Sequence, residues 1–149
     1  MMLPERNPMP ETDDRISFKN PEGAPAGDKT IVESPEHNWI VERNLADNIS
    51  TLKVIRDSGI RRIEDINLEI ENRTIERYTT VANNHESPRG EVVTHRGYRR
   101  GDWHVQTKTK TILTSDETHF RIRAELDAFK NGHRFFSKSW DERVARDCV

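Results

Sequence analysis

Alternating polar and apolar residues dominate the chain between residues 101 and 143. Over 103–113, a tryptophan, a valine, three threonines and a leucine share every second position, and mostly polar side chains lie between them. The alternation resumes over 118–129, where Phe120, Ile122 and Leu126 share one parity. A period of two is typical of a β-strand with one face in a core and the other in water. The sequence therefore predicts two long strands of an antiparallel sheet.

Further segments rich in β-branched and aromatic residues predict more strands. We expect them at 36–45, 51–56, 73–81, 91–99 and 133–142, with a possible short one at 61–65. Asp57–Gly59 has the composition of a turn, 67–72 is a loop or one helical turn, and Gly97 marks a bulge or bend. Asn131–Gly132 predicts a two-residue hairpin turn, because both of its central positions need positive φ.

The pairing of these strands is less determined by the pattern. A loop at 114–117 would put like charges opposite each other, Lys108 with Arg123 and Lys110 with Arg121, which costs a few tenths of a kcal/mol. Asp141 and Glu142 in the last strand could reach Arg121 and relieve the repulsion. The final hairpin has two possible registers, one with Phe136 and Trp140 inside and one with Phe135 inside.

Proline separates two regions of the chain. Six of the seven prolines lie within the first 35 residues, where apolar content is too low to offset the entropy of ordering. We expect 1–35 to be an extended or disordered arm and 36–149 to be one antiparallel β domain. The fold class is all-β, and a meander of this kind would close into a sandwich or barrel.

Composition narrows the function classes. A net charge of −2 gives no basic field for nucleic acid, and no apolar run approaches the ~20 residues of a membrane helix. The N-terminus lacks a secretory signal pattern, and the single cysteine, Cys148, cannot form a disulfide within the chain. These features predict a cytoplasmic protein that binds neither nucleic acid nor membranes.

Motifs that carry chemistry are missing. The six histidines lack the spacing of metal sites, and no Gly-x-Ser-x-Gly or glycine-rich phosphate loop occurs. His95 and His104 could meet across a hairpin near Gly101, although a solvated strand face explains both. We therefore expect no catalytic residue, cofactor or metal. One set of side chains could line a cavity, or else mark the edge of a core: Trp103, Thr107, Thr109 and Thr111.

Four segments together resemble a known family: EIENRTIERY at 69–78, GDWHVQTKTKTILT at 101–114, THFRIRAELDAFK at 118–130 and FSKSWDERVARDCV at 136–149. Their wording is similar to the C-terminal β-rich region of CocE/NonD family hydrolases, relatives of the X-Pro dipeptidyl-peptidases (peptidase S15). That family hydrolyses ester or amide bonds with a Ser-Asp-His triad in an α/β-hydrolase domain. No position here matches that domain, so no catalytic residue carries over.

The resemblance implies a non-catalytic accessory β domain that packs on an α/β-hydrolase catalytic domain or subunit. Two alternatives stay open. One is a small-molecule-binding β-barrel lined by the threonine row and Trp103. The other is a homo-oligomeric structural module that uses an exposed sheet edge.

Overall fold

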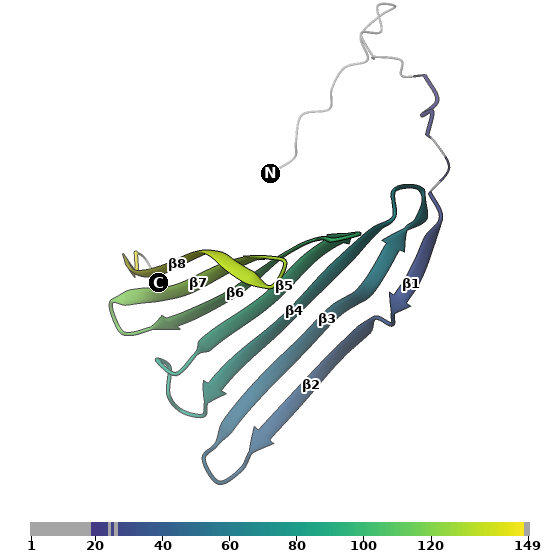
Figure 1. The fold of residues 1–149 in the computed structure, drawn as a ribbon. Helices are drawn as coiled ribbons and strands as arrows, with labels where there is room; N and C mark the ends of the chain where they lie inside the picture. The colour runs from purple at the N-terminus through teal and green to yellow at the C-terminus, as the bar shows by residue number, and fades with distance from the viewer. Residues whose placement is uncertain (1–18, 24, 26, 148–149) are drawn as a thin grey trace, which may run out of the picture.

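A single antiparallel sheet makes up the molecule (Figure 1). The computed structural model describes residues 19–23, 25 and 27–147. A short 3₁₀ helix, η1 (Glu64–Ile66), separates two of the eight strands. The strands are β1 (Lys29–Glu33), β2 (Glu36–Asn44), β3 (Ile49–Ile63), β4 (Leu68–Val81), β5 (Arg89–Arg100), β6 (Trp103–Ser115), β7 (His119–Lys130) and β8 (His133–Ala145).

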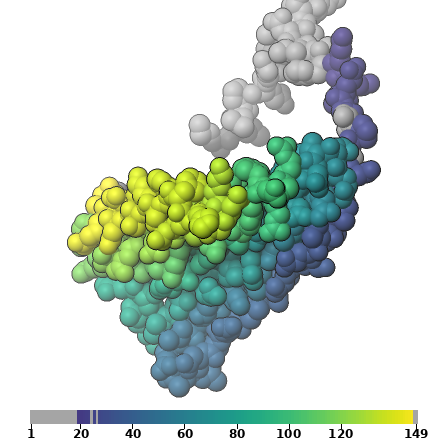
Figure 2. All heavy atoms as spheres, in the orientation of Figure 1, coloured from purple at the N-terminus to yellow at the C-terminus, as the bar shows by residue number. Residues whose placement is uncertain are grey.

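The strands follow one another as a meander. Their order is β1-β3-β4-β5-β6-β7-β8, and β2 pairs with β3 beside β1. The predicted all-β antiparallel meander is confirmed, but the sheet does not close into a sandwich or barrel. Closure would need β8 to pair with β1 or β2, whereas these strands lie at opposite ends of the molecule (Figures 1 and 2). The described residues therefore form one open layer with two free edges.

Part of the N-terminal segment belongs to this sheet. β1 lies within 1–35 and pairs with the second half of β3. Most of the predicted arm, 1–18 with residues 24 and 26, lies outside the described residues.

Asparagine and glycine supply the turns, as the sequence predicts. Asn131 and Gly132 have φ of 51° and 79°, which confirms the two-residue hairpin between β7 and β8. Asn48 joins β2 to β3 with φ of 53°.

Asp57–Gly59 is a bulge and not the predicted turn. The pairing of β3 with β4 shifts between Asp57 and Ile60, and the strand continues to Ile63. Gly59 has φ of 63°, and a Cβ atom there would lie 2.0 Å from the carbonyl oxygen of Glu33. The glycine thus lets the β1–β2 connection pass close to β3, where only glycine fits.

The predicted pairing of β6 with β7 was wrong by four residues. Lys108 lies opposite Asp127 and Lys110 opposite Glu125, so opposite charges replace the like charges expected. β6 extends two residues past its predicted end, to Ser115, and β7 begins at His119, so the turn between them lies further along the chain than predicted. The observed register thus removes the like-charge repulsion at these two positions.

A bulge sets the register of the last hairpin. The pairing of β7 with β8 shifts between Ala128 and Phe129, so that Phe135 is the extra residue. Phe136 pairs with Ala128 and Trp140 with Ala124, which puts both aromatic rings on one face. The alternative with Phe136 and Trp140 together is therefore the one the fold adopts.

The core is small for a chain of this length. Among the described residues, the buried apolar side chains are Val54, Ile55 and Ala128. Val54 and Ile55 are neighbours in β3 and point to opposite faces, because successive strand residues alternate. A single layer leaves both faces of the sheet open. The side chains of the two faces differ in kind and in the contacts that they make.

Candidate docking face

One face of the sheet holds all three tryptophans and both tyrosines of the chain. The strand register places them there together with most of the aliphatic side chains of β5–β7. We call this surface the apolar face. Its members include Trp39, Leu52, Val54, Tyr78, Val92, Tyr98, Trp103, Val105, Leu113, Ile122, Leu126, Phe136 and Trp140.

Nothing in the described chain covers the apolar face. Trp39 is 74% exposed and Val41 71%, and Phe136 near the other edge is 48% exposed. Tyr78 and Tyr98 in the middle of the sheet are also exposed. Exposed apolar surface of this extent marks an interaction site.

The opposite surface, which we call the ion-pair face, satisfies its charges internally. Glu91 accepts a hydrogen bond from Arg89 at 2.6 Å, and Arg77 and Lys110 lie 3.4 and 3.7 Å from its carboxylate. The hydrogen bond from Arg89 lowers the pKa of Glu91, and the nearby cations act in the same direction. Similar ion pairs lie on this face toward both edges of the sheet. They are Arg62–Glu69 and Arg73–Asp57 on β3 and β4, and Arg121–Asp141 and Arg134–Asp127 on β7 and β8.

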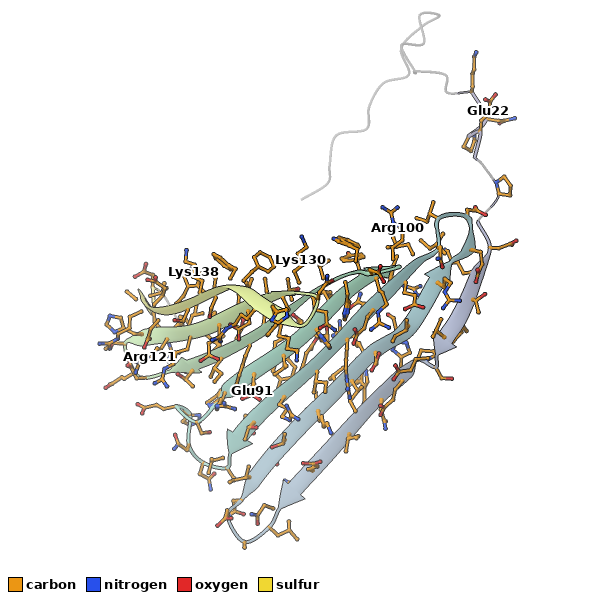
Figure 3. The ribbon with its side chains drawn as sticks, in the orientation of Figure 1. Glu22, Glu91, Arg100, Arg121, Lys130 and Lys138 are labelled. Atoms are coloured by element: carbon orange, nitrogen blue, oxygen red, sulfur yellow. The ribbon has the colours of Figure 1, made fainter. Side chains whose placement is uncertain are left out.

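The two faces are separate at the β7–β8 edge. Figure 3 shows Lys130 and Lys138 above these strands and Arg121 on the other side. Arg121 donates from Nε to Asp141 Oδ1 at 2.8 Å, which confirms the contact that the sequence predicts. This contact lowers the pKa of Asp141 and raises that of Arg121.

Asp116 closes the β6–β7 hairpin. Its Oδ1 accepts hydrogen bonds from the backbone N–H groups of Thr118 and His119, at 2.9 and 2.7 Å. These bonds lower the pKa of Asp116 to about 2, and Arg143 adds an ion pair at 3.2 Å. The geometry is that of a structural turn, since the carboxylate is fully engaged by its own loop.

The four residues predicted to line a cavity all lie on the apolar face. Thr109 shares a hydrogen bond with Thr94 across β5 and β6, and Trp103 is exposed beside Arg100. Because the sheet is open, no barrel interior forms around Trp103, Thr107, Thr109 and Thr111. Their role as cavity lining stays a prediction.

A shallow hollow of about 270 Å³ lies over β4, β5 and β6. It is lined by Arg73, Ile75, Val93, Thr94, His95 and Lys108. His95 Nδ1 lies 3.0 Å from a carboxylate oxygen of Glu71, while its Nε2 is buried without a hydrogen-bond partner. The expected approach of His95 to His104 was wrong, because His95 pairs with Lys108 and His104 with Arg99. A histidine–carboxylate pair is present, but its strand-bound neighbours include no nucleophile aimed at the ring.

Metal sites and membrane helices can be assessed for the same residues. Within 19–23, 25 and 27–147, no group of three or more His, Cys, Asp or Glu side chains could hold a metal ion. The part of the chain that the structure describes also has no helix of the length and hydropathy needed to cross a bilayer.

Comparison of the chain with family models, with curated proteins and with solved structures gave no significant match. The functional argument therefore depends on the apolar face itself. Sequence reasoning singled out Trp103 and the threonine row but missed the gathering of the other aromatic residues. The sequence does show on which of the two faces of its own strand each tryptophan and tyrosine lies. That these are the same face of the sheet follows only from the pairing register between the strands.

Proposed function

We propose that this chain is a non-catalytic accessory β domain of a CocE/NonD-type (peptidase S15-like) serine hydrolase. In this proposal the apolar face packs on an α/β-hydrolase catalytic domain or subunit. The four similar segments and the all-β fold support the family assignment. The uncovered apolar face supports the docking role.

The observation that carries the docking role is the surface area. The chain has a solvent-accessible area of 12,503 Å². A folded monomer of its mass, 17.4 kDa, has an area of about 7,900 Å². The 22 residues outside the described ranges would expose about 3,700 Å² as an unfolded chain. A folded monomer of the remaining mass, about 14.8 kDa, would expose about 7,000 Å², which leaves an excess of about 1,800 Å².

An excess of this size has a structural meaning. A sheet that is apolar on one face must bury that face against another layer to form a stable core. Obligate interfaces bury about 2,000–5,000 Å² in total, or half of that on each partner. The uncovered area of this chain is therefore about one side of such an interface, and a catalytic domain would supply the missing layer.

The proposal assigns no reaction to the chain alone. The described residues bring no serine, histidine and carboxylate together in a triad, and the His95–Glu71 pair lacks a nucleophile. We propose that the complex is cytoplasmic. Ester or amide hydrolysis would be carried out by the partner.

Tryptophan fluorescence can test the docking directly, because all three tryptophans lie on the apolar face. The experiment titrates the full chain with a purified CocE/NonD-type α/β-hydrolase, after replacing accessible tryptophans of the hydrolase where needed. We expect binding to protect the tryptophans of this chain from acrylamide quenching. Binding that left them unprotected, or no binding, would contradict the proposal.

Catalysis provides a second measurement. The purified chain should not hydrolyse a chromogenic short-chain ester. Hydrolysis by the chain alone that disappears on substitution of a single residue would make it an enzyme and overturn the accessory role.

A homo-oligomeric module is the second candidate, favoured by the two free sheet edges at β2 and β8. An open edge exposes unpaired backbone groups that can add a strand from another chain. Light scattering distinguishes the two, since a concentration-independent monomer removes this candidate. The small-molecule alternative needs an enclosed cavity, whereas the hollow over β4–β6 lies on the surface of the sheet.

A further inference from the structure

Four cations lie on the β5, β7 and β8 part of the apolar face, and none of them is opposite a carboxylate in the strand register. They are Arg96, Arg100, Lys130 and Lys138, and we call this region the basic end. Among the described residues, none of the four forms an ion pair, whereas Arg121, Arg123 and Arg134 on the other face of β7 and β8 each have one. Figure 3 shows Arg100, Lys130 and Lys138 along the same side of the sheet. On β7 and β8, therefore, whether a cation has an ion pair depends on the face of the sheet on which it lies.

Arg96 shows the missing partner most directly. It lies on β5 opposite Thr107, and its Nη1 is buried without a hydrogen-bond partner. An unsatisfied buried donor costs about 1–3 kcal/mol, and more when it is charged. A guanidinium offers several donors in a fixed plane that matches a carboxylate. The guanidinium of Arg96 therefore lacks an acidic partner among the described residues.

Aromatic rings surround these cations. Tyr98, Trp103 and Phe136 are each 43–48% exposed, and Lys138 Nζ lies 4.8 Å from the centre of the Trp140 ring. Tryptophan, tyrosine and arginine are the residue types that most often anchor protein interfaces. The basic end thus has the composition of an interface centre, with apolar rings and unpaired positive charge side by side.

Resting on the proposed docking role, we propose that the surface received by the basic end is an apolar protein surface that carries carboxylates. It is not a second copy of this chain. Aspartate or glutamate side chains of the partner would pair with the four cations, and its apolar side chains would pack on the rings. Such pairs fix the orientation of two partners and speed their association.

The charges of the chain argue against self-association through this face. The strand register gives the apolar face eight cations, Lys29, Arg43, Arg56, Arg61, Arg96, Arg100, Lys130 and Lys138, and two carboxylates, Glu76 and Glu142. Two such faces brought together would repel each other. The ion-pair face is no better as a partner, because five of its carboxylates are already held by cations of the same face.

Two synthetic peptides test the charge preference without knowledge of the partner. Both are amphipathic helices of equal length with a stripe of leucine, and the positions that flank this stripe on both sides carry either glutamate or lysine. Tryptophan fluorescence of the full chain reports binding. We expect the glutamate peptide to bind at least tenfold more tightly in about 50 mM salt, and the advantage to shrink in about 500 mM salt, where charges are screened.

A matched pair of variants locates the effect. Lys130→Glu with Lys138→Glu reverses the basic end and should remove the preference for the glutamate peptide. Arg123→Glu with Arg134→Glu makes the same charge change on the other face of the same two strands and should keep it. Circular dichroism and the thermal midpoint show whether both variants fold.

Each remaining outcome counts against the inference. Equal affinity for the two peptides, tighter binding of the lysine peptide, no binding of either, or equal losses in both variants would overturn it. So would a stable dimer of the chain that shields its tryptophans. Failure of the hydrolase to bind would instead contradict the proposed function, so the two failures are distinguishable.

Discussion

The apolar face and the ion-pair face belong to the same strands, and neither is covered by a second layer of the described chain. Their side chains differ in whether they find partners within the sheet. On the ion-pair face a carboxylate such as Glu91 has three cations within reach on its own face. On the apolar face Trp39 and Val41 remain largely exposed. Polar groups can find partners within one layer, but apolar area can leave water only against a second layer. Among the described residues, the ion-pair face therefore has partners for its charges within the sheet, whereas the apolar face has no second layer to bury its side chains.

The largest expected effect concerns the two neighbours that are buried on opposite faces. Ile55→Ala on the ion-pair face should lower the free energy of unfolding by about 3 kcal/mol, and Val54→Ala on the apolar face by about 2 kcal/mol. Both lose buried methyl groups, and isoleucine loses one more carbon. Urea denaturation of each variant measures the difference.

A partner layer should change only one of these values. Saturation with the hydrolase should stabilise the Ile55→Ala variant as much as the wild-type chain, but stabilise Val54→Ala less, because the partner packs over that face. An equal gain for both variants would show that the partner does not contact the sheet near Val54.

How far the sequence determines these faces can be seen in particular residues. The period-two pattern correctly placed Trp103 and the threonines at 107, 109 and 111 on one face, because alternation is a local property of a strand. Asn131–Gly132 fixed its hairpin for the same reason, since its backbone angles are local. Local rules therefore predicted most of the strands and this turn. They were wrong for residues 68–72, which were expected in a loop or a helical turn and belong to β4.

Long-range features were beyond local rules. The true pairing of Lys108 with Asp127 depends on where two strands end, and the pattern of either strand fits several registers. Gly97 was expected to mark a bulge or a bend, and the pairing runs through it without a shift, so there is no bulge. Position 97 is instead a glycine because the side chain of Glu71 on the neighbouring strand occupies the space that a Cβ atom would need. Which strand lies beside which, and whether the sheet closes, depends on contacts that no single segment contains.

Two glycines of β5 lie on opposite faces of the sheet and differ in how much room there is for a side chain. Gly97 lies on the ion-pair face, where a Cβ would come within 2.8 Å of a carboxylate oxygen of Glu71 and 3.3 Å of its Cβ. Gly97→Ala should therefore cost about 1 kcal/mol and displace Glu71 from His95. Thermal unfolding measures the cost, and the NMR shifts of the His95 ring report the displacement.

Gly90→Ala is the matched substitution on the apolar face. Its Cβ would lie 3.8 Å from two ring carbons of Tyr78, which is ordinary contact, so the variant should gain about 0.5 kcal/mol. A loss of stability in Gly90→Ala, or none in Gly97→Ala, would contradict the close packing assigned to the ion-pair face.

Acid should weaken the ion-pair side of the molecule selectively. Asp116 has a pKa of about 2 against an ordinary value of 3.8, because backbone N–H groups stabilise its charged form. A lowered pKa in the folded state contributes stability above the unfolded value, and the contribution is lost as the pH falls from about 4 toward 2. Asp116→Asn should therefore flatten the fall of the thermal midpoint over this range. An unchanged acid profile would mean that the turn does not hold its carboxylate in solution.

The smallest effect should come from the exposed ion pair Arg134–Asp127, whose atoms lie 3.4 Å apart with the Arg134 side chain 61% exposed. Pairs of this kind contribute about 0.2–1 kcal/mol because water and salt screen them. Arg134→Ala should change the free energy of unfolding by less than about 0.5 kcal/mol, and the change should vanish in about 1 M salt. Lys130→Ala removes a cation of the apolar face that has no ion pair among the described residues, and it should be neutral or slightly stabilising in the free chain. Its cost should emerge only in the complex, where the charge gains a carboxylate. If Lys130→Ala destabilised the free chain more than Arg134→Ala did, the basic end would already satisfy this charge, and the contrast between the two faces would not hold there.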